Sequence, residues 1–243
     1  SMAWIMRPIS REISPREEKK KLLLSPTPLP FRSFDLNGAE FRGFQPQSFS
    51  DYKGCIAAVL FTGGCNFRCR FCYNTPLVVA PERLPPLSAL KALELLQERE
   101  GFLDAVVISG GEPTVNPWIL PFLERLRRLP FRIGLDTNGS NPRILKQVIE
   151  AGLVDRIAMD LKGPPEKYPL IIQRKGYEKA VLQSLRIVVQ QEHEIRLTLH
   201  PLLHTQEDIK LMADLLYRVG ANRIALQSFK PWNVLDPSLE KTQ

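Results

Sequence analysis

Cysteine is scarce in this sequence, and the few cysteines present are gathered in one place. Only four occur among 243 residues, and three of them, Cys65, Cys69 and Cys72, fall within a stretch of eight. Small secreted proteins that depend on disulfides carry many cysteines spread along the chain. The pattern argues against a disulfide framework and indicates metal ligation in a reducing compartment, so we expect a cytoplasmic protein.

Long apolar runs and long basic runs are also missing. No apolar run approaches the roughly 20 residues that span a bilayer, and the first residues lack the order of a secretion signal, so we expect no membrane partner. The longest basic run is residues 19–21, although the net charge is +7. The basic balance leaves an RNA partner open, but so short a run does not favour one.

The chain changes character near residue 42. Its 243 residues suffice for one large domain or two small ones. Residues 1–42 contain five scattered prolines and one short helical pattern at residues 17–24, so we expect an irregular N-terminal extension. Residues 43–243 are regular in pattern, and we expect them to form the core domain.

Apolar segments typical of buried strands alternate with amphipathic helical patterns through this core domain. The expected strands lie at residues 56–61, 105–108, 132–135, 156–159, 195–199 and 223–226. The expected helices lie at residues 88–100, 118–129, 142–151, 176–191 and 206–219. Ser88 and Asn141 are candidate caps at two helix starts, and Gly152 and Gly220 follow two helix ends.

This alternation predicts an α/β fold with parallel strands joined by right-handed crossovers. Six units are too few to close an eight-stranded barrel, so an open partial barrel and a doubly wound sheet both fit. In either fold the carboxyl ends of the strands form the ligand face. Polar segments follow every expected strand, at residues 65–72, 109–114, 136–139, 160–162, 200–201 and 227–228. Each could be a cap or a turn by itself, but together they predict one site.

Three closely spaced thiols without a fourth suggest an iron–sulfur cluster whose last iron has no protein ligand. A 4Fe–4S cluster normally takes four thiolates, one for each iron. The remaining cysteine, Cys55, precedes the strand at residues 56–61, and a strand of that length places it about 20 Å from the ligand end. We therefore expect Cys55 to be a buried core residue. A zinc site completed by His193, His200 or His204 is an alternative, but the cysteines lack the paired spacing of zinc ribbons.

The spacing Cys65-x3-Cys69-x2-Cys72, with Phe71 before the last cysteine, resembles the radical S-adenosylmethionine superfamily, as does Gly-Gly-Glu-Pro at residues 110–113. The resemblance covers residues 43–230. It implies a partial (β/α)6 barrel of the TIM type and a 4Fe–4S cluster on the three cysteines. S-adenosylmethionine would bind the open iron. Its amino group would lie near Gly110, Gly111 and Glu112, and its adenine near Phe71, Cys72 and Tyr73.

Further segments resemble the activating enzymes of glycyl radical enzymes, especially anaerobic ribonucleotide reductase activating proteins. They are residues 44–45, 51–52, 136–139 and 159–162. The resemblance implies that Asp136 and Thr137 help to bind a monovalent cation beside the methionine moiety. It also places Asp160 and Lys162 at the cofactor, as candidate catalytic residues. The remaining candidate cofactor contacts are Asn138, His200 and Gln227, the last of which stands where formate-lyase activases have a histidine.

The resemblance implies an oxidoreductase that cleaves S-adenosylmethionine reductively to a 5′-deoxyadenosyl radical. The radical would abstract a hydrogen atom, in an activase from a backbone glycine of a partner enzyme, with flavodoxin or ferredoxin as electron donor. One alternative is an enzyme that modifies a small molecule or RNA, such as a 7-carboxy-7-deazaguanine synthase, although Tyr73-Asn74-Thr75 is not the usual sequence there. Another is a non-enzymatic electron-transfer protein, which would need a fourth cluster ligand.

Overall fold

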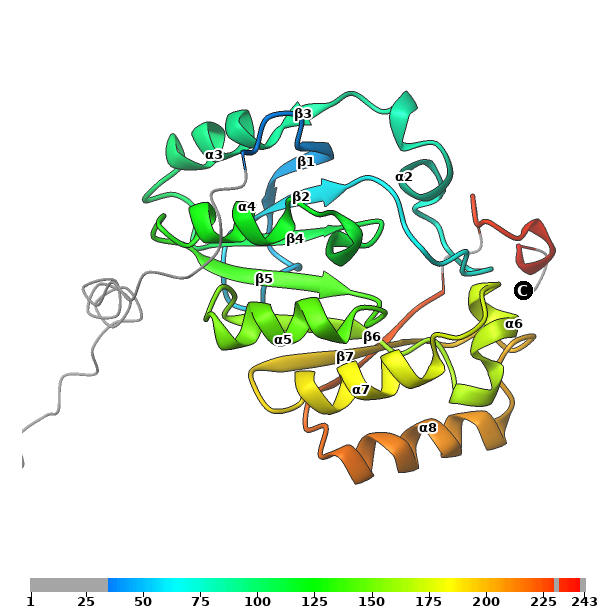
Figure 1. Ribbon diagram of the computed structural model, residues 1–243. Helices are drawn as coiled ribbons and strands as arrows, with labels where there is room; N and C mark the ends of the chain where they lie inside the picture. The colour runs from blue at the N-terminus through cyan, green and yellow to red at the C-terminus, as the bar shows by residue number, and fades with distance from the viewer. Residues whose placement is uncertain (1–34, 230–231, 241–243) are drawn as a thin grey trace, which may run out of the picture. The chain divides into compact units, whose positions relative to one another are not determined.

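One sheet of eight strands runs through the part of the chain that the structure describes. The computed structural model describes residues 35–229 and 232–240 (Figure 1). The strand order is β3-β1-β2-β4-β5-β6-β7-β8. The helix expected at residues 17–24, and most of the expected extension, lie outside the described residues.

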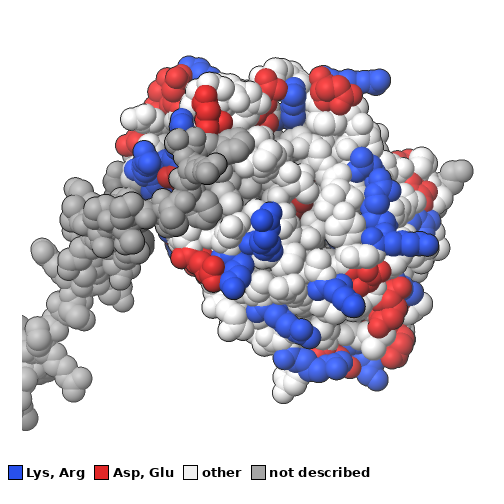
Figure 2. Space-filling model, viewed as in Figure 1, with Lys and Arg blue, Asp and Glu red and all other residues white. Residues whose placement is uncertain are grey.

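Charged side chains of both signs are mixed over the surface. Figure 2 shows basic and acidic side chains interspersed on one face of the described residues, without a continuous field of one sign. Among the same residues no helix is both long and apolar enough to cross a membrane. An RNA partner stays a prediction that this face does not favour.

Six strands are parallel and follow one another in chain order. They are β2 (Ala57–Thr62), β4 (Ala105–Gly110), β5 (Arg132–Thr137), β6 (Arg156–Asp160), β7 (His193–Thr198) and β8 (Ile224–Gln227). All six predicted strands are confirmed, with ends shifted by one or two residues. A doubly wound sheet reverses its strand order part of the way along. The unbroken order therefore distinguishes the two predicted alternatives and makes the fold a partial barrel of the TIM type.

Two strands were not predicted. Strand β1 (Glu40–Ser48) pairs antiparallel with β2, and β3 (Leu87–Ser88) pairs antiparallel with β1. The sheet thus begins before Gly43, inside the range assigned to the extension. The sequence of β1 has no continuous apolar run, and its pairing with β2 contains two register shifts. It is anchored by Phe41, whose buried ring packs edge-on against a neighbouring helix.

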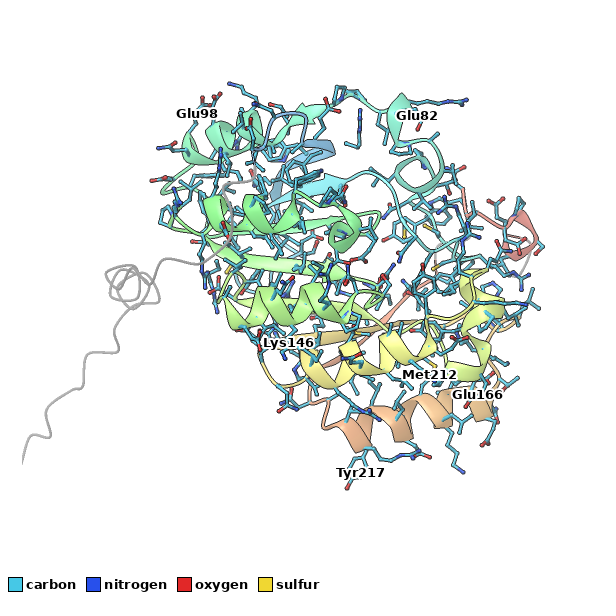
Figure 3. All side chains as sticks on the ribbon, in the orientation of Figure 1. Glu82, Glu98, Lys146, Glu166, Met212 and Tyr217 are labelled. Atoms are coloured by element: carbon cyan, nitrogen blue, oxygen red, sulfur yellow. The ribbon has the colours of Figure 1, made fainter. Side chains whose placement is uncertain are left out.

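Five helices pack their apolar sides against one face of the sheet, namely α3 (Ala89–Gln97), α4 (Ile119–Leu126), α5 (Pro142–Glu150), α7 (Glu178–Val188) and α8 (Gln206–Val219). Two short helices, α2 (Thr75–Val79) and α6 (Tyr168–Ile172), lie in the connections after β2 and β6. The short helices α2 and α6 were not predicted. In α8, Met212 is 1% exposed and joins the core, whereas Tyr217 is 86% exposed and points away from the sheet (Figure 3). Ser88 and Asn141 cap α3 and α5 as predicted, and Gly220 ends α8.

A reciprocal hydrogen-bond pair holds the first turn of α8. The Thr205 hydroxyl accepts from the Asp208 N–H at 3.2 Å, and the Asp208 carboxylate accepts from the Thr205 N–H at 2.7 Å. Lys167 forms an ion pair with the same carboxylate. Burial alone would raise the pKa of Asp208, but the hydrogen bonds from Lys167 and Thr205 outweigh it and lower the pKa to about 2. The ionised carboxylate therefore stabilises the folded state.

Replacing Asp208 with asparagine should destabilise the protein by about 1 kcal/mol at neutral pH, since a helix cap is weakened. Because the pKa of Asp208 in the folded protein lies below the ordinary aspartate value of 3.8, the stability that the charge contributes is present above that value and is lost as the pH falls through about 2. Urea unfolding of the wild type and the variant should give a difference in the free energy of unfolding that is constant near neutral pH and becomes smaller in acid. The exposed Asp214→Asn variant is the control. An equally large difference in the free energy of unfolding at neutral and at acidic pH would contradict the prediction.

A second, smaller core fills the inside of the barrel near the amino ends of the parallel strands. It consists of Tyr52, Ala57, Val59, Ala105 and Val107. Tyr52 is 2% exposed, and two guanidinium groups lie over its ring, that of Arg156 at 4.5 Å and that of Arg132 at 5.3 Å from the ring centroid. The residues around it are small, which leaves room for the ring. This core closes the barrel at the amino ends of the strands, and the polar segments lie at the carboxyl ends.

Candidate active site

The three predicted ligand cysteines lie on one loop after β2, residues 63–74, which we call the cysteine loop. Cys69 is buried, and Cys65 and Cys72 are half-buried. The loop is held to the end of α6 by backbone hydrogen bonds, from Arg68 N to Ile172 O at 2.9 Å and from Arg70 N to Ile171 O at 3.0 Å. A helix more than 90 residues further along the chain therefore fixes the shape of the loop.

Residues beyond the last strand hold the same loop from another direction. Leu235 N donates to Cys72 O and Asp236 N donates to Arg70 O, both at 2.9 Å. The Arg70 guanidinium also pairs with the Asp236 carboxylate at 2.6 Å. Sequence reasoning missed this segment because residues 232–240 show neither helical nor strand periodicity.

The surroundings of the thiols suit an iron–sulfur cluster. Burial raises the pKa of Cys65 to about 11 and that of Cys69 to about 12, although nearby Lys162 lowers both. Cluster ligation takes the thiolate form, so assembly would release protons from these groups. The Phe67 N–H lies 3.4 Å from the Cys65 sulfur and the Asn138 side-chain amide lies 3.7 Å from it. Hydrogen bonds to ligand sulfurs are a usual feature of such sites, so the residues fit a three-thiolate cluster.

Cys55 and His193 lie at the opposite end of the sheet. Cys55 precedes β2 and packs against the core around Tyr52, as expected from its position, although it is half-buried rather than fully buried. His193 is the first residue of β7, and its Nδ1 lies 2.8 Å from Gln191 O. Among the described residues, no three His, Cys, Asp or Glu side chains converge as ligands of a single metal ion.

The glycine pair at the end of β4 lets two backbones approach each other. Gly110 has φ +120°, and a Cβ there would lie 2.4 Å from the backbone of Thr62. A Cβ on Gly111 would lie 1.9 Å from Gly64 O, at the start of the cysteine loop. Because neither glycine has a Cβ, the end of β4 can lie directly against the backbone of β2 and of the cysteine loop.

Glu112 is fully buried and ties the ends of β4 and β5 together. Its carboxylate accepts hydrogen bonds from Thr114 N and Oγ1, from Thr137 Oγ1 and from Asn138 N, at 2.6–3.0 Å. Burial raises its pKa, and these hydrogen bonds oppose the rise. The side chain therefore orients Asn138 toward Cys65. Any contact of Glu112 with S-adenosylmethionine stays a prediction.

Charged side chains from β5, β6, β7 and the residues directly after β6 form a layer inside the barrel, which we call the charged layer. It consists of Asp136, Asp160, Lys162, Glu194 and Arg196. Lys162 Nζ lies 2.8 Å from an Asp160 oxygen, and Arg196 lies 3.0 Å from Asp136 and 2.9 Å from Glu194. The predicted residues Asp136, Asp160 and Lys162 are thus brought together. Sequence analysis missed Arg196. The signal that could have indicated it is a charged residue inside the strand expected at residues 195–199.

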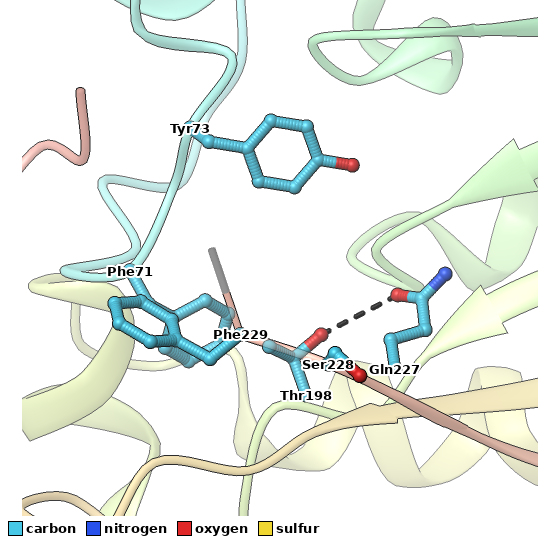
Figure 4. A pocket seen from close by; sticks show the side chains of 6 residues that line it. All are labelled: Phe71, Tyr73, Thr198, Gln227, Ser228 and Phe229. Carbon is cyan, nitrogen blue, oxygen red and sulfur yellow. Dashed lines mark hydrogen bonds between the residues drawn. The ribbon is translucent and has the colours of Figure 1, made fainter. Parts of the chain in front are cut away.

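A pocket of about 280 Å³ opens between the cysteine loop and the ends of β7 and β8. Its lining residues are Phe71, Tyr73, Thr198, Gln227, Ser228 and Phe229. Figure 4 shows the Tyr73 ring on one side and Thr198 with Gln227 on the other, the last two joined by a hydrogen bond of 3.4 Å. Aromatic walls with a few polar groups are typical of a small-molecule site. Three predicted cofactor contacts, Phe71, Tyr73 and Gln227, meet here.

The predicted cofactor contact His200 lies behind this pocket, not on its surface. It is 1% exposed, and its ring packs edge-on against Phe229 with the centroids 4.5 Å apart. Burial lowers its pKa, and its Nδ1 accepts a hydrogen bond from Leu202 N at 3.1 Å. His200 therefore supports Phe229. His204 is also buried, and its Nε2 lies 2.8 Å from Lys162 O.

Sequence comparison with known proteins identifies a family and individual relatives of this chain. The profile of the radical SAM superfamily matches residues 59–218, from β2 into α8 and including the cysteine loop. A protein of Methanocaldococcus jannaschii, provisionally named as a glycyl-radical enzyme activating enzyme, is 28% identical over 207 residues, which are 82% of this chain and 83% of the relative. The 7-carboxy-7-deazaguanine synthase of Methanopyrus kandleri is 32% identical over 138 residues, covering 49% of this chain and 54% of that enzyme.

The fold also resembles a solved structure of low sequence identity. Streptococcus suis SuiB, in its structure with the precursor peptide SuiA, superimposes with a TM-score of 0.61 at 14% identity. The match covers 76% of this chain and 42% of SuiB. At this identity the likeness concerns the fold alone.

Proposed function

We propose that this chain, which belongs to the radical SAM superfamily, activates a glycyl radical enzyme by abstracting a hydrogen atom from one of its backbone glycines. The observation that carries the proposal is the similarity to the Methanocaldococcus jannaschii protein. At 28% identity it extends over 83% of that relative, so it includes most of both chains and not only a shared cofactor motif. The likeness of residues 136–139 and 159–162 to activating enzymes supports the same role.

A 4Fe–4S cluster and S-adenosylmethionine are the cofactors of this superfamily and of this chain. When bound, they supply a 5′-deoxyadenosyl radical, formed by one-electron cleavage of the sulfonium. Cys65, Cys69 and Cys72 hold the cluster, and the burial of Cys69 (8% exposed) keeps water from that ligand. Lys162 lies close enough to Cys69 and Cys72 for its charge to act on both thiols. We infer that its ammonium stabilises the negative charge of the ligated loop.

The pocket provides the contacts for the nucleoside part of the cofactor. Phe71 and Tyr73 offer aromatic faces, and the Gln227 amide and Thr198 hydroxyl offer polar groups across from them. Tyr73 is 52% exposed, so a partner loop can reach this rim of the pocket. The electron donor in the proposal is a flavodoxin or a ferredoxin.

The test is to reconstitute the protein anaerobically, reduce it and incubate it with S-adenosylmethionine and a candidate glycyl radical enzyme. We expect an electron paramagnetic resonance signal of a glycyl radical in the partner, together with 5′-deoxyadenosine. A partner whose target glycine is replaced by alanine is the control. Formation of 5′-deoxyadenosine without a radical in any glycyl radical enzyme encoded beside this chain would contradict the activase role and leave the radical chemistry standing.

The second candidate is a radical enzyme that modifies a small molecule. It is favoured by the similarity to the Methanopyrus kandleri synthase, at 32% identity over 138 residues. Transfer of deuterium from a labelled small-molecule heterocycle into 5′-deoxyadenosine would support this candidate over the activase.

A further inference from the structure

The side-chain amide of Asn138 has one orientation that satisfies its neighbours. Its Oδ1 accepts a hydrogen bond from Ser140 N at 2.9 Å, and a backbone N–H group only donates. This bond distinguishes the amide oxygen from the amide nitrogen, which have the same shape. The Nδ2 group therefore points the other way, where it lies 3.0 Å from Asn66 Oδ1 and 3.7 Å from the Cys65 sulfur.

Both protons of this NH2 group have an acceptor on the cysteine loop. One is directed at Asn66 Oδ1 and the other at the Cys65 sulfur. Asn66 is itself held in place, because its Nδ2 donates to Ser140 Oγ at 2.9 Å. Asn138 is 6% exposed, so water has little access to the amide. The Asn138 amide is thus a buried donor to a candidate cluster ligand.

The backbone on both sides of the amide is also fixed. Asn138 N donates to the buried Glu112 carboxylate at 2.6 Å, which joins the end of β5 to the end of β4. The next residue, Gly139, has φ +73°, and a Cβ there would overlap the Met159 side chain on β6. The chain therefore turns directly after Asn138 and keeps the amide against the Cys65 sulfur.

A hydrogen bond to a ligand sulfur changes how readily an iron–sulfur cluster accepts an electron. The reduced cluster carries one more negative charge, part of which lies on the ligand sulfurs. An N–H group directed at the sulfur stabilises that charge, so it favours the reduced cluster and raises the reduction potential. The effect is larger where water is excluded. The Cys65 sulfur also accepts from Phe67 N at 3.4 Å, but that donor is backbone and remains in any side-chain variant.

We propose that Asn138 raises the reduction potential of the cluster through its hydrogen bond to the Cys65 sulfur, and thereby makes the cluster easier to reduce. Asn138 acts through Cys65 and is therefore a positioning residue. The inference rests on ligation of the cluster by Cys65. It is independent of the activase role and of which hydrogen atom the enzyme abstracts.

The test is a redox titration of the reconstituted full-length protein, followed by the electron paramagnetic resonance signal of the reduced cluster. Asn138→Leu removes the donor and nearly keeps the shape of the side chain. We expect a tenfold lower ratio of reduced to oxidised cluster at a given potential, which is a fall of about 59 mV in the midpoint for one electron. Asn138→Asp should lower the midpoint at least as far, because a carboxylate oxygen then faces the sulfur.

Ser140→Ala is the matched control. It removes a hydroxyl from the same group of hydrogen bonds, but it keeps the backbone N–H that orients Asn138. Its midpoint should equal that of the wild type. Iron content shows whether each variant carries a full cluster. An Asn138→Leu protein with full iron content and the wild-type midpoint would overturn the proposal, and the ligand role of Cys65 would still stand.

A measurement on the wild type keeps the test valid if the Asn138 variants assemble no cluster. Protein labelled with the heavy nitrogen isotope only in asparagine side chains should show a coupling between that nitrogen and the electron spin of the reduced cluster in pulsed electron paramagnetic resonance. The Asn66 side-chain nitrogen donates to Ser140 and not to a sulfur, so we assign the coupling to Asn138. A labelled wild type without this coupling would also overturn the proposal.

Discussion

Replacing Cys69 with alanine should abolish cluster assembly, whereas replacing Cys55 with alanine should leave it intact. Cys69 is buried in the cysteine loop beside the other two candidate ligands, and a 4Fe–4S cluster with two protein thiolates lacks half of the usual four. Cys55 lies at the far end of β2. Iron and sulfide content after anaerobic reconstitution, with the charge-transfer absorbance of the cluster, measures the difference.

Cys55→Ala is a matched control, because both variants remove one thiol. Full iron content in Cys69→Ala would refute the ligand assignment. A large loss of iron in Cys55→Ala would instead make Cys55 a fourth cluster ligand. It would favour an electron-transfer protein, because that function requires a protein ligand on every iron of the cluster. Variants of Cys65 and Cys72 should behave as Cys69→Ala does.

Replacing Gly111 with alanine should destabilise the protein by more than about 3 kcal/mol, since the new methyl group overlaps backbone. Its Cβ would lie 1.9 Å from Gly64 O. That oxygen cannot move away easily, because it accepts from Glu112 N at 2.8 Å while Gly64 N donates to Leu77 O at 2.8 Å. The cysteine loop would have to separate from β4, and the cluster ligands would move with it.

Urea unfolding of the protein before cluster assembly measures this effect without a contribution from iron. Gly101→Ala is the control: Gly101 has φ +88° and no atom within 4 Å of its added Cβ. There the cost is backbone strain alone, about 1 kcal/mol. Equal stability of the Gly111 and Gly101 variants would show that the loop adapts, contrary to the contact geometry.

Much of the barrel could be predicted from the sequence because its signals are local. A buried parallel strand needs a short apolar run, and a helix needs an apolar stripe with suitable caps, both visible within a few neighbouring residues. Asn141 before Pro142 predicts the start of α5 in this way, and the structure confirms it. The cysteine spacing is likewise local, so the three candidate ligands were identified without the fold.

Other features depend on partners far along the chain. Strand β1 exists because the edge of β2 is available to pair with it, and its own sequence carries no strand signal. His200 was expected at the cofactor because it follows a strand, yet packing against Phe229 turns it into the core.

The sequence by itself determines the candidate cluster ligands and the end of the barrel at which they lie. Both follow from short segments, because ligand spacing and strand ends are local properties. The electrostatics of the site are not local. Arg196 meets Asp136 across an intervening strand, at 3.0 Å and 60 residues apart in sequence. The cysteine loop is fixed by α6 and by residues beyond β8. Such contacts form only when the sheet curves and brings these segments together, so only the tertiary structure decides which charges the cofactor site contains.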